Sequence, residues 1–271
     1  MMALLKFAGM ARSTYYYHLK QMEKPDKHSV LKSEILLIFN ENKGRYGYRR
    51  ITLELRNRKI VANHKLVRKL MNELNLKAEI KKRKYKSYRG DIGEAAPNVI
   101  NRDFKAGKPN LKWTTDISEF SIPAGKLYLS PILDMFNGEI VSYSLEQSPT
   151  FYCTMSMLKK ALNKTKETSG LIIHSDQGWQ YRMREYQKTL TQNGIIQSMS
   201  RKGNCFDNAI MENFFGLIKK EMFYGNEFKY KTLTELALDI KDYINYYNNR
   251  RIKFKLNGLS PIQYRKQSLM A

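Results

Sequence analysis

Three acidic residues are placed where they could bind divalent metal ions together. Asp116 lies on the polar face of an expected strand, Asp176 ends the short apolar strand Leu171–Asp176, and Glu212 lies on an expected helix within Ser200–Met222. If the two strands are neighbours in one sheet, their acids meet at one edge and the helix brings the third acid across them. Such carboxylates repel one another, by about 4 kcal/mol for a pair roughly 4 Å apart at an effective dielectric constant near 20. The set therefore requires cations.

Oxygen ligands with open coordination positions favour Mg²⁺. Two Mg²⁺ ions about 3.5–4 Å apart, for which Mn²⁺ can substitute, polarise a phosphodiester and activate a water or a 3′-hydroxyl for in-line displacement. Asp116, Asp176 and Glu212 are therefore the candidate metal ligands and catalytic residues of a phosphodiester-transfer site.

The segment around Glu212 surrounds this acid with groups suited to nucleic acid. Asp207 is the expected N-cap of the helix. The repeat of 3.6 residues per turn puts Asn208, Glu212, Phe215 and Lys219 on one face of that helix. Asn208 and Lys219 are therefore expected near the acids.

The elements that must position these acids alternate between strands and helices. An Asn-Gly pair is a strong hairpin signal, so three antiparallel strands are expected first. The expected order is strand Leu111–Phe120, strand Lys126–Phe136, strand Glu139–Gln147, helix Thr150–Lys166, strand Leu171–Asp176, helix Met183–Asn193, strand Ile195–Met199 and the helix of Glu212. This order predicts a mixed α/β fold of the ribonuclease H type, in which helices flank a five-stranded mixed sheet.

A small all-α domain is expected before this core. Its helices are expected at Ser29–Asn42, Tyr48–Arg58 and Asn63–Leu74. The third helix has an apolar stripe at Leu66, Leu70 and Leu74, and its opposite face carries Lys65, Arg68 and Lys69. Short helices with one apolar and one basic face are typical of small DNA-binding domains.

The charge of the chain points to a polyanionic partner. The net charge is +23, and positions 41–90 carry 17 Lys or Arg against 4 Asp or Glu. Much of this excess lies in a segment without apolar periodicity, a linker or mobile arm that contains Lys81, Lys82, Arg83 and Lys84. Each phosphate that such residues neutralise adds roughly −0.9 to the slope of log affinity against log salt concentration for DNA binding. Nucleic acid is the expected partner.

These patterns predict five segments. They are a short helical segment at 1–24, the helical DNA-binding domain at 25–80, a basic linker at 81–110, the catalytic core at 111–225, and a C-terminal helix and tail at 226–271 that complete the core. The first segment, broken at Gly9 and capped by Ser13, is either the tail of a helix-turn-helix unit or a docking helix or frayed end.

Membrane and secretory classes are not expected. No run approaches the roughly 18–20 apolar residues of a membrane span, and the amino terminus lacks a signal-peptide cleavage site. Cys153 and Cys205 are distant in sequence, which indicates a reducing compartment rather than a disulfide framework. The histidines and cysteines show no paired zinc spacing. We expect a cytoplasmic protein without a membrane partner.

Four separated blocks resemble a known family. WTTDISEF, HSDQGWQY and SRKGNCFDNAIMENFFGLIKKE are similar to the three catalytic blocks of DDE transposases related to retroviral integrases, and 35 residues separate Asp176 from Glu212, as in that group. YYNNRRIKFKLNGLSPIQY is similar to the closing motif of bacterial insertion-sequence transposases encoded in two overlapping frames. The resemblance extends over nearly all of 29–264, and the chain looks like the second-frame (OrfB-type) product.

The resemblance implies a DNA strand-transferase. Asp116, Asp176 and Glu212 would bind Mg²⁺, and Lys219 would contact DNA. The implied partners are the terminal inverted repeats of the element, target DNA, further copies of this chain on DNA, and an upstream-frame (OrfA-type) product. The implied location is the bacterial cytoplasm, at the nucleoid. Unlike retroviral integrases, the chain lacks the cysteines for a His₂Cys₂ zinc module.

Several residues allow two interpretations. His174 either touches substrate or only packs and forms hydrogen bonds, and Glu119 and Asp134 are either extra ligands or solvated strand-edge residues. The basic loop before the helix, with Arg201 and Lys202, either contacts DNA or is solvated. The last group, from the end of a long helix, either contacts DNA or fixes that helix against the core: Tyr246, Asn248, Arg250 and Arg251.

Two other functions fit parts of the sequence. A ribonuclease H or structure-selective nuclease would use the same acids without needing terminal repeats. A DNA-binding regulator or inactive remnant would occupy the ends of the element without cutting them. An assay for metal-dependent strand transfer on those ends distinguishes a transposase from both of these alternatives.

Overall fold

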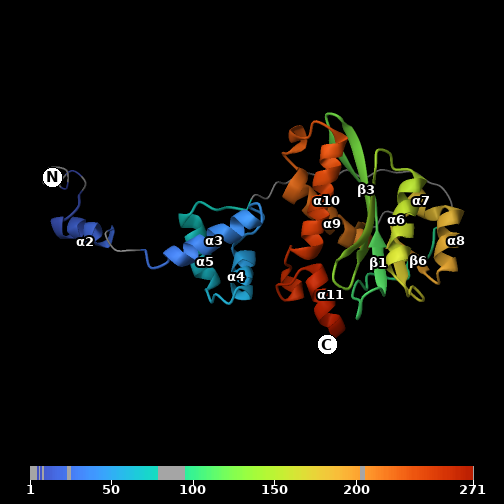
Figure 1. The fold of residues 1–271 in the computed structure, drawn as a ribbon, viewed down its shortest axis with the longest axis horizontal. Coiled ribbons are helices and arrows are strands. Elements are labelled where there is room, and N and C mark those ends of the chain that lie inside the picture. Colours follow the sequence, from blue (N-terminus) through green and yellow to red (C-terminus); the bar gives the residue numbers. More distant parts are fainter. Residues whose placement is uncertain are drawn as a thin grey trace. The chain divides into compact units, whose positions relative to one another are not determined.

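The computed structural model describes residues 5, 7, 9–22, 26–78, 95–201 and 205–270 (Figure 1). The chain divides into two compact units, residues 1–78 and 79–271, each of which is described by itself. The division falls close to the boundary expected after residue 80. The basic-arm candidates Lys81, Lys82, Arg83 and Lys84 and the loop candidate Lys202 lie outside the described residues.

The first unit is helical, as predicted. Its described helices are α2 (Arg12–Met22), α3 (Ser29–Glu41), α4 (Tyr48–Asn57) and α5 (His64–Glu73). Gly9, where a break was expected, has a positive φ of 61°. Ser13 lies inside α2 rather than before it, so the expectation that it caps this helix is wrong.

The core of the first unit lies between α3, α4 and α5. Asn63 caps α5, since its Oδ1 accepts a hydrogen bond from the Lys65 N–H at 2.8 Å. The buried face of α5 is formed by Val67, Leu70 and Met71, and the predicted stripe is correct only at Leu70. A spacing of i, i+4, i+8 drifts around a helix of 3.6 residues per turn, whereas i, i+3, i+4 holds to one face.

The second unit contains a six-stranded mixed sheet. Its strands are β1 (Lys112–Thr115), β2 (Ser118–Ile122), β3 (Gly125–Asp134), β4 (Ile140–Glu146), β5 (Ile172–Ser175) and β6 (Ile196–Met199). They lie in the order β2-β3-β1-β5-β6, and β4 also pairs with β3. The pairs β1–β5 and β5–β6 are parallel and the others are antiparallel.

The sheet has six strands rather than five because the first predicted strand is divided. It breaks at Asp116 and Ile117 into β1 and β2, which both pair with β3. At the break, the Asp116 Oδ1 accepts a hydrogen bond of 2.7 Å from the Ile117 N–H. The first acid therefore lies at a bend at the end of β1, not within a continuous strand.

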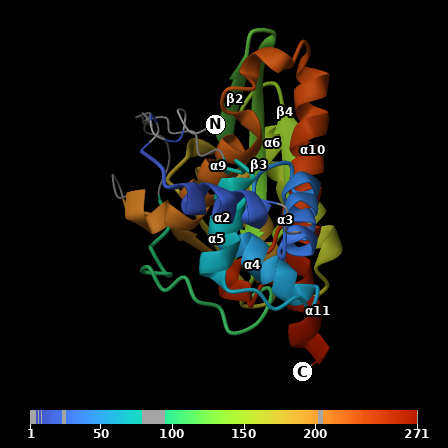
Figure 2. The ribbon, with the colours of Figure 1, turned by 90° about the vertical axis from the view of Figure 1, so that its left-hand side faces the viewer.

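Helices cover both faces of the sheet. They are α6 (Phe151–Lys164), α7 (Trp179–Arg182), α8 (Arg184–Gln192), α9 (Ala209–Ile218), α10 (Leu233–Asn249) and α11 (Pro261–Met270). The short turns are the 3₁₀ segments η1 (Cys205–Asn208), η3 (Glu227–Lys229) and η4 (Phe254–Leu256) and the π-helical segment η2 (Lys219–Phe223). Figure 1 shows α6, α7 and α8 on one face and α9 and α10 on the other. In Figure 2, α10 runs beside the long strands β3 and β4.

Each face of the sheet has its own apolar core. The α6 and α8 face buries Trp113, Ile173, Leu158 and Leu190. The α9 and α10 face buries, among others, Phe120, Phe214, Ile218, Ile240 and Tyr243. β5 lies between β1 and β6, and its residues Ile173, His174 and Ser175 are buried, as expected of a strand in the interior of a sheet. Within the described part of the chain, no helix has the length and apolarity that crossing a membrane requires.

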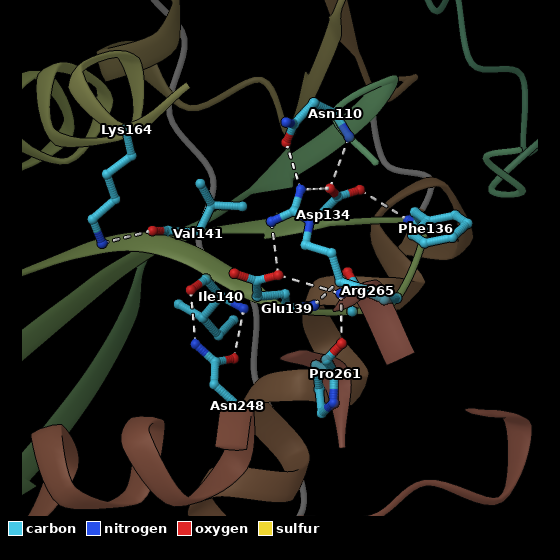
Figure 3. Close-up of polar contacts among 12 residues, drawn as sticks. Asn110, Asp134, Phe136, Glu139, Ile140, Val141, Lys164, Asn248, Pro261 and Arg265 are labelled. Atoms are coloured by element: carbon cyan, nitrogen blue, oxygen red, sulfur yellow. Dashed lines mark hydrogen bonds and ion pairs between the residues drawn. The ribbon is translucent and has the colours of Figure 1, made fainter. Parts of the chain in front are cut away.

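The C-terminal helix α11 is joined to the end of β3 by a polar network (Figure 3). The Arg265 guanidinium donates to Asp134 Oδ2 at 2.9 Å and to Glu139 Oε2 at 2.7 Å. The Asp134 carboxylate also accepts from the Asn110 and Phe136 N–H groups. Through this network the C-terminal helix contacts the sheet of the second unit.

Candidate active site

Asp116 and Asp176 lie side by side at one edge of the sheet. Asp116 follows β1 and Asp176 follows β5, and the parallel register pairs Thr114 with His174, two residues before each acid. Because the carboxyl ends of parallel strands meet at the same edge, the fold brings together these two acids, which are 60 positions apart in the numbering. Both are half-buried, so their outer sides are open to a substrate.

The two aspartates place two carboxyl groups close together in a partly buried position. Burial raises the pKa of Asp116 well above its usual range, and the charges of Asp176 and Glu212 add to this. Burial also raises the pKa of Asp176, against the effect of a 2.9 Å hydrogen bond from the Gly178 N–H. A cation between the two would favour both ionised forms.

Glu212 lies in the first turn of α9 and its side chain is exposed. It acts electrostatically on Asp116. Among the described residues, no three His, Cys, Asp or Glu side chains lie close enough together to hold a metal ion. The structure thus brings the two aspartates together and places Glu212 at their periphery, outside such a cluster.

Asn208 supplies an oxygen that fits a metal site. Its Nδ2 donates to Asp116 Oδ2 at 2.9 Å. Its Oδ1 is buried and has no hydrogen-bond partner in the part of the chain that the structure describes. A buried carbonyl oxygen without a partner costs about 1–3 kcal/mol. Asp116, Asp176 and Asn208 therefore present the all-oxygen donor set that Mg²⁺ prefers.

Lys219 lies at the end of α9, on the side of the acids. Its Nζ lies 5.1 Å from the centre of the Phe120 ring. Burial lowers the pKa of Lys219, while the charges of Glu119 and Asp116 oppose this change. A half-buried ammonium loses part of its hydration and so gains more from a phosphate.

His174 is buried, and its ring contacts are internal. Its Nδ1 lies 2.9 Å from Ser198 Oγ, and its Nε2 lies 3.2 Å from Ser200 Oγ and 3.1 Å from the Asp207 carbonyl oxygen. Burial lowers its pKa, which favours the neutral ring. These contacts favour the second of its two interpretations, a packing and hydrogen-bonding role.

Asp207 is not the N-cap that its position predicts. Helix α9 begins after Asn208 without a side-chain cap, and the 3₁₀ turn η1 precedes it. The Asp207 carboxylate is instead buried and accepts from Arg201 Nε at 3.0 Å, Arg102 Nε at 2.9 Å and Asn98 Nδ2 at 3.0 Å. Arg201 therefore binds Asp207 at the start of the helix. This contact does not decide between the two interpretations of Arg201, DNA contact and solvation.

Glu119 and Asp134 lie apart from the two aspartates. Glu119 is exposed and accepts from Lys126 Nζ at 3.2 Å and Tyr128 Oη at 2.8 Å. Asp134 pairs with Trp113, at the opposite end of β1 from Asp116, and it is fully buried. The interpretation of Asp134 as a solvated strand-edge residue is therefore wrong. Its carboxylate forms an ion pair with Arg265.

The remaining DNA-contact candidates differ in exposure. Lys65, Arg68 and Lys69 are exposed on α5, and the Arg68 guanidinium lies 5.7 Å from the centre of the Tyr48 ring. Arg250 is exposed, whereas Arg251 is 2% exposed and ion-paired with Glu221. Of the two roles open to Arg251, fixing the helix against the core fits this placement.

The sequence patterns missed residues that depend on distant contacts. Tyr181 is buried beside the site, where burial and the charges of Asp116 and Asp176 raise its pKa. A Cβ at Gly178 would lie 2.9 Å from Asp176 Oδ1, so a larger residue here would displace this carboxylate oxygen. Both residues lie in the HSDQGWQY block, Gly178 two residues after the acid and Tyr181 at the end of the block, but only the fold shows that Tyr181 is buried beside the site.

The chain matches three family profiles. Two are described as integrase core domains, at residues 106–205 and 212–269, and the third as an HTH-like domain, at residues 26–84. These matches coincide with the two units.

Relatives match along nearly the whole chain. A protein described as a transposase, InsK, for insertion sequence element IS150 of Escherichia coli (strain K12) is 53% identical over 98% of this chain and 94% of that protein. The transposase for insertion sequence element IS904 of Lactococcus lactis is 38% identical over 92% of this chain and 98% of that protein. Among solved structures, the simian T-cell lymphotropic virus intasome in complex with PP2A regulatory subunit B56 gamma is similar in fold, with a TM-score of 0.51 and 17% identity over 85% of this chain and 74% of that chain. The chain belongs to the insertion-sequence transposases with an HTH-like domain and an integrase catalytic core of the ribonuclease H type.

Proposed function

We propose that this transposase uses Asp116, Asp176 and Glu212 to cut DNA at the ends of its element and to join the freed 3′-hydroxyl to another phosphodiester. The observation that carries the assignment is the pair of half-buried aspartates at the ends of β1 and β5, where burial raises the pKa of both carboxyls and a bound cation would favour their ionised forms. Cleavage and joining are the same in-line displacement with different nucleophiles. A water attacks first and the 3′-hydroxyl second.

The donor set fits divalent cations, and we propose two Mg²⁺ ions, for which Mn²⁺ can substitute. Asp116 and Asp176 would hold them, with Glu212 supplied by α9 and the Asn208 Oδ1 as a further oxygen. When bound, such ions polarise the phosphodiester, activate the nucleophile and stabilise the leaving oxygen. The chain itself orients these oxygens, through the Asn208 hydrogen bond to Asp116 and the Gly178 hydrogen bond to Asp176.

DNA is held by residues on both units in this proposal. Lys219 contacts a phosphate beside the acids, Arg201 one at the helix start, and Lys65, Arg68 and Lys69 bind the terminal repeats. Residues Lys81, Lys82, Arg83, Lys84, Lys202 and Arg250 add further phosphate contacts. We also propose that several copies of the chain act together on DNA, in the bacterial cytoplasm at the nucleoid, with an upstream-frame product as partner.

The test is strand transfer on oligonucleotides that carry the ends of the element, with and without Mg²⁺. Glu212→Gln removes the charge but keeps the shape, and joining should fall more than about 100-fold, beyond the range for residues that only orient metal ligands. Glu185→Gln, an exposed acid at the start of α8, is the matched control and should keep full activity. Equal joining by wild type and Glu212→Gln would refute the assignment.

A further inference from the structure

A π-helical turn separates α9 from the long helix α10. It is η2 (Lys219–Phe223), and the Tyr224 N–H donates to the Lys219 carbonyl oxygen at 2.7 Å, the spacing of a π turn. Such turns are rare, and they are frequent at functional sites. Residues two apart on a helix point about 200° away from each other, so Lys219 and Glu221 face nearly opposite sides.

The Glu221 side of the turn is held by a buried ion pair. Arg251 Nε donates to Glu221 Oε2 at 2.8 Å, and its NH2 group donates to Oε1 at 2.5 Å. The Tyr243 hydroxyl donates to Oε2 at 2.9 Å. The Arg251 and Glu221 side chains are only 2% and 11% exposed. A two-pronged arginine–carboxylate contact fixes orientation as well as distance.

The Lys219 side of the turn faces the active site. The Lys219 ammonium lies over the face of the Phe120 ring, and the Phe223 ring meets the same ring edge-on, with centroids 5.1 Å apart. Phe120 is buried in β2, four positions after Asp116. The turn is thus fixed to the strand that follows the first acid and, through Glu221, to Tyr243 within α10 and to Arg251 just after this helix.

We infer that Glu221, Arg251 and Tyr243 form a positioning group that holds the π turn so that the Lys219 ammonium faces the acid site. The inference rests on the proposed function, in which Lys219 contacts a DNA phosphate there. It gives a role to Arg251, which is too deeply buried to reach DNA.

Stability alone is a poor account of this pair. Desolvation of two charges offsets most of their attraction, and apolar residues of similar volume often stabilise a protein as well or better. The pair does supply one fixed geometry across a turn that departs from the regular helix. Loss of that geometry would move Lys219 while leaving the acids in the sheet unchanged.

A double-mutant cycle between Glu221→Gln and Lys219→Ala tests this inference. Each change alone should lower the rate of end joining by about 10- to 100-fold, the range for groups that orient a site residue. The double variant should be no worse than Lys219→Ala alone, because Glu221 acts through Lys219. We also expect the slope of log affinity against log salt concentration for DNA binding to fall in magnitude by about 0.9, the value for one phosphate contact. This decrease should be the same in each single variant and in the double variant.

Two further variants keep the result interpretable if Glu221→Gln folds poorly. Tyr243→Phe removes one hydrogen bond from Glu221, and should slow joining in the wild-type background but not in Lys219→Ala. Lys220→Ala removes the same charge from an exposed position in the same turn, and should leave the joining rate unchanged. Thermal unfolding of every variant reports its folding.

The outcomes separate this inference from the proposed function. If Glu212→Gln abolishes joining but the effects of Glu221→Gln and Lys219→Ala multiply, or if Lys219→Ala joins normally, the positioning role is wrong and the function stands. If Glu212→Gln joins as wild type does, the proposed function itself is wrong.

Discussion

At the scale of single residues, Asp207 connects the start of the active-site helix to one residue nearby in the sequence and to one far from it. Its carboxylate binds Arg201, six residues before it, and Arg102, 105 residues before it. The next residue, Asn208, donates to Asp116. The Asp207 ion pairs therefore fix the backbone from which the Asn208 amide reaches the acids.

Asp207→Asn should destabilise the protein in a pH-dependent manner. The two arginines hold the pKa of Asp207 far below its usual range. A lowered folded-state pKa stabilises the protein above the unfolded value of about 3.9, and this contribution is lost as the pH falls from there toward the folded value. Near pH 7 the variant should lose about 2 kcal/mol, as for hydrogen bonds to charged groups.

Urea unfolding at several pH values measures this difference. The gap between wild type and Asp207→Asn should be constant between pH 5 and 8, roughly one pH unit above the unfolded pKa and beyond, and should shrink at lower pH. A gap that is independent of pH down to the acid limit of folding would contradict the ionic role.

At the scale of elements, the end of α10 is joined to β4 by one side chain. Asn248 Oδ1 accepts from the Ile140 N–H and its Nδ2 donates to the Ile140 carbonyl oxygen, both at 2.9 Å (Figure 3). The β3–β4 register shifts between Ile132 and Leu133, next to the Leu133–Ile140 pair. The amide therefore satisfies the backbone N–H and C=O of Ile140, in addition to the pairing of this residue with Leu133 of β3.

Asn248→Ala should destabilise the second unit because it leaves a buried N–H and a buried C=O without partners. The expected loss is about 2–6 kcal/mol, from about 1–3 kcal/mol for each of the two groups. Asn249→Ala, at the exposed neighbouring position, should change stability by less than about 0.5 kcal/mol. Thermal unfolding of the two variants checks the difference, and similar losses would contradict this role of Asn248.

Local patterns predicted the elements better than their partners. The apolar start of the β5 segment and the helical face of Glu212 are properties of short segments, so the strands and the helices could be predicted from the sequence, and the same segments mark the three acids as candidates. The division of the first strand at Asp116 arises from a side chain that bonds its own neighbour. The ion pairs of Asp134 with Arg265 and of Asp207 with Arg102 join residues more than 100 positions apart, and no local pattern specifies them.

At the scale of the whole molecule, the chain separates a basic helical unit from an acidic catalytic centre. The net charge is +23, and α5 presents three exposed basic residues, Lys65, Arg68 and Lys69. A strongly basic surface attracts DNA of any sequence, and in the proposed function the acids act on the phosphodiester that reaches them.

The triple variant of Lys65, Arg68 and Lys69 to alanine should weaken binding to the ends of the element. If all three contact phosphates, the slope of log affinity against log salt should fall in magnitude by about 2.7. A control variant that replaces Lys159, Lys188 and Lys266, exposed lysines of the second unit, removes the same charge. Equal changes in the two slopes would assign the effect to net charge rather than to α5.

The contacts of residues 96–102 decide where a catalytic fragment of this transposase can begin. The Val99 N–H donates to Ser198 Oγ at 3.0 Å beside β6, and the Arg102 guanidinium binds the buried Asp207. A fragment cut at residue 111, just before β1, would lose both contacts and leave a buried carboxylate with Arg201 alone. Crystallisation and activity studies of the isolated core should therefore use fragments that begin no later than residue 95.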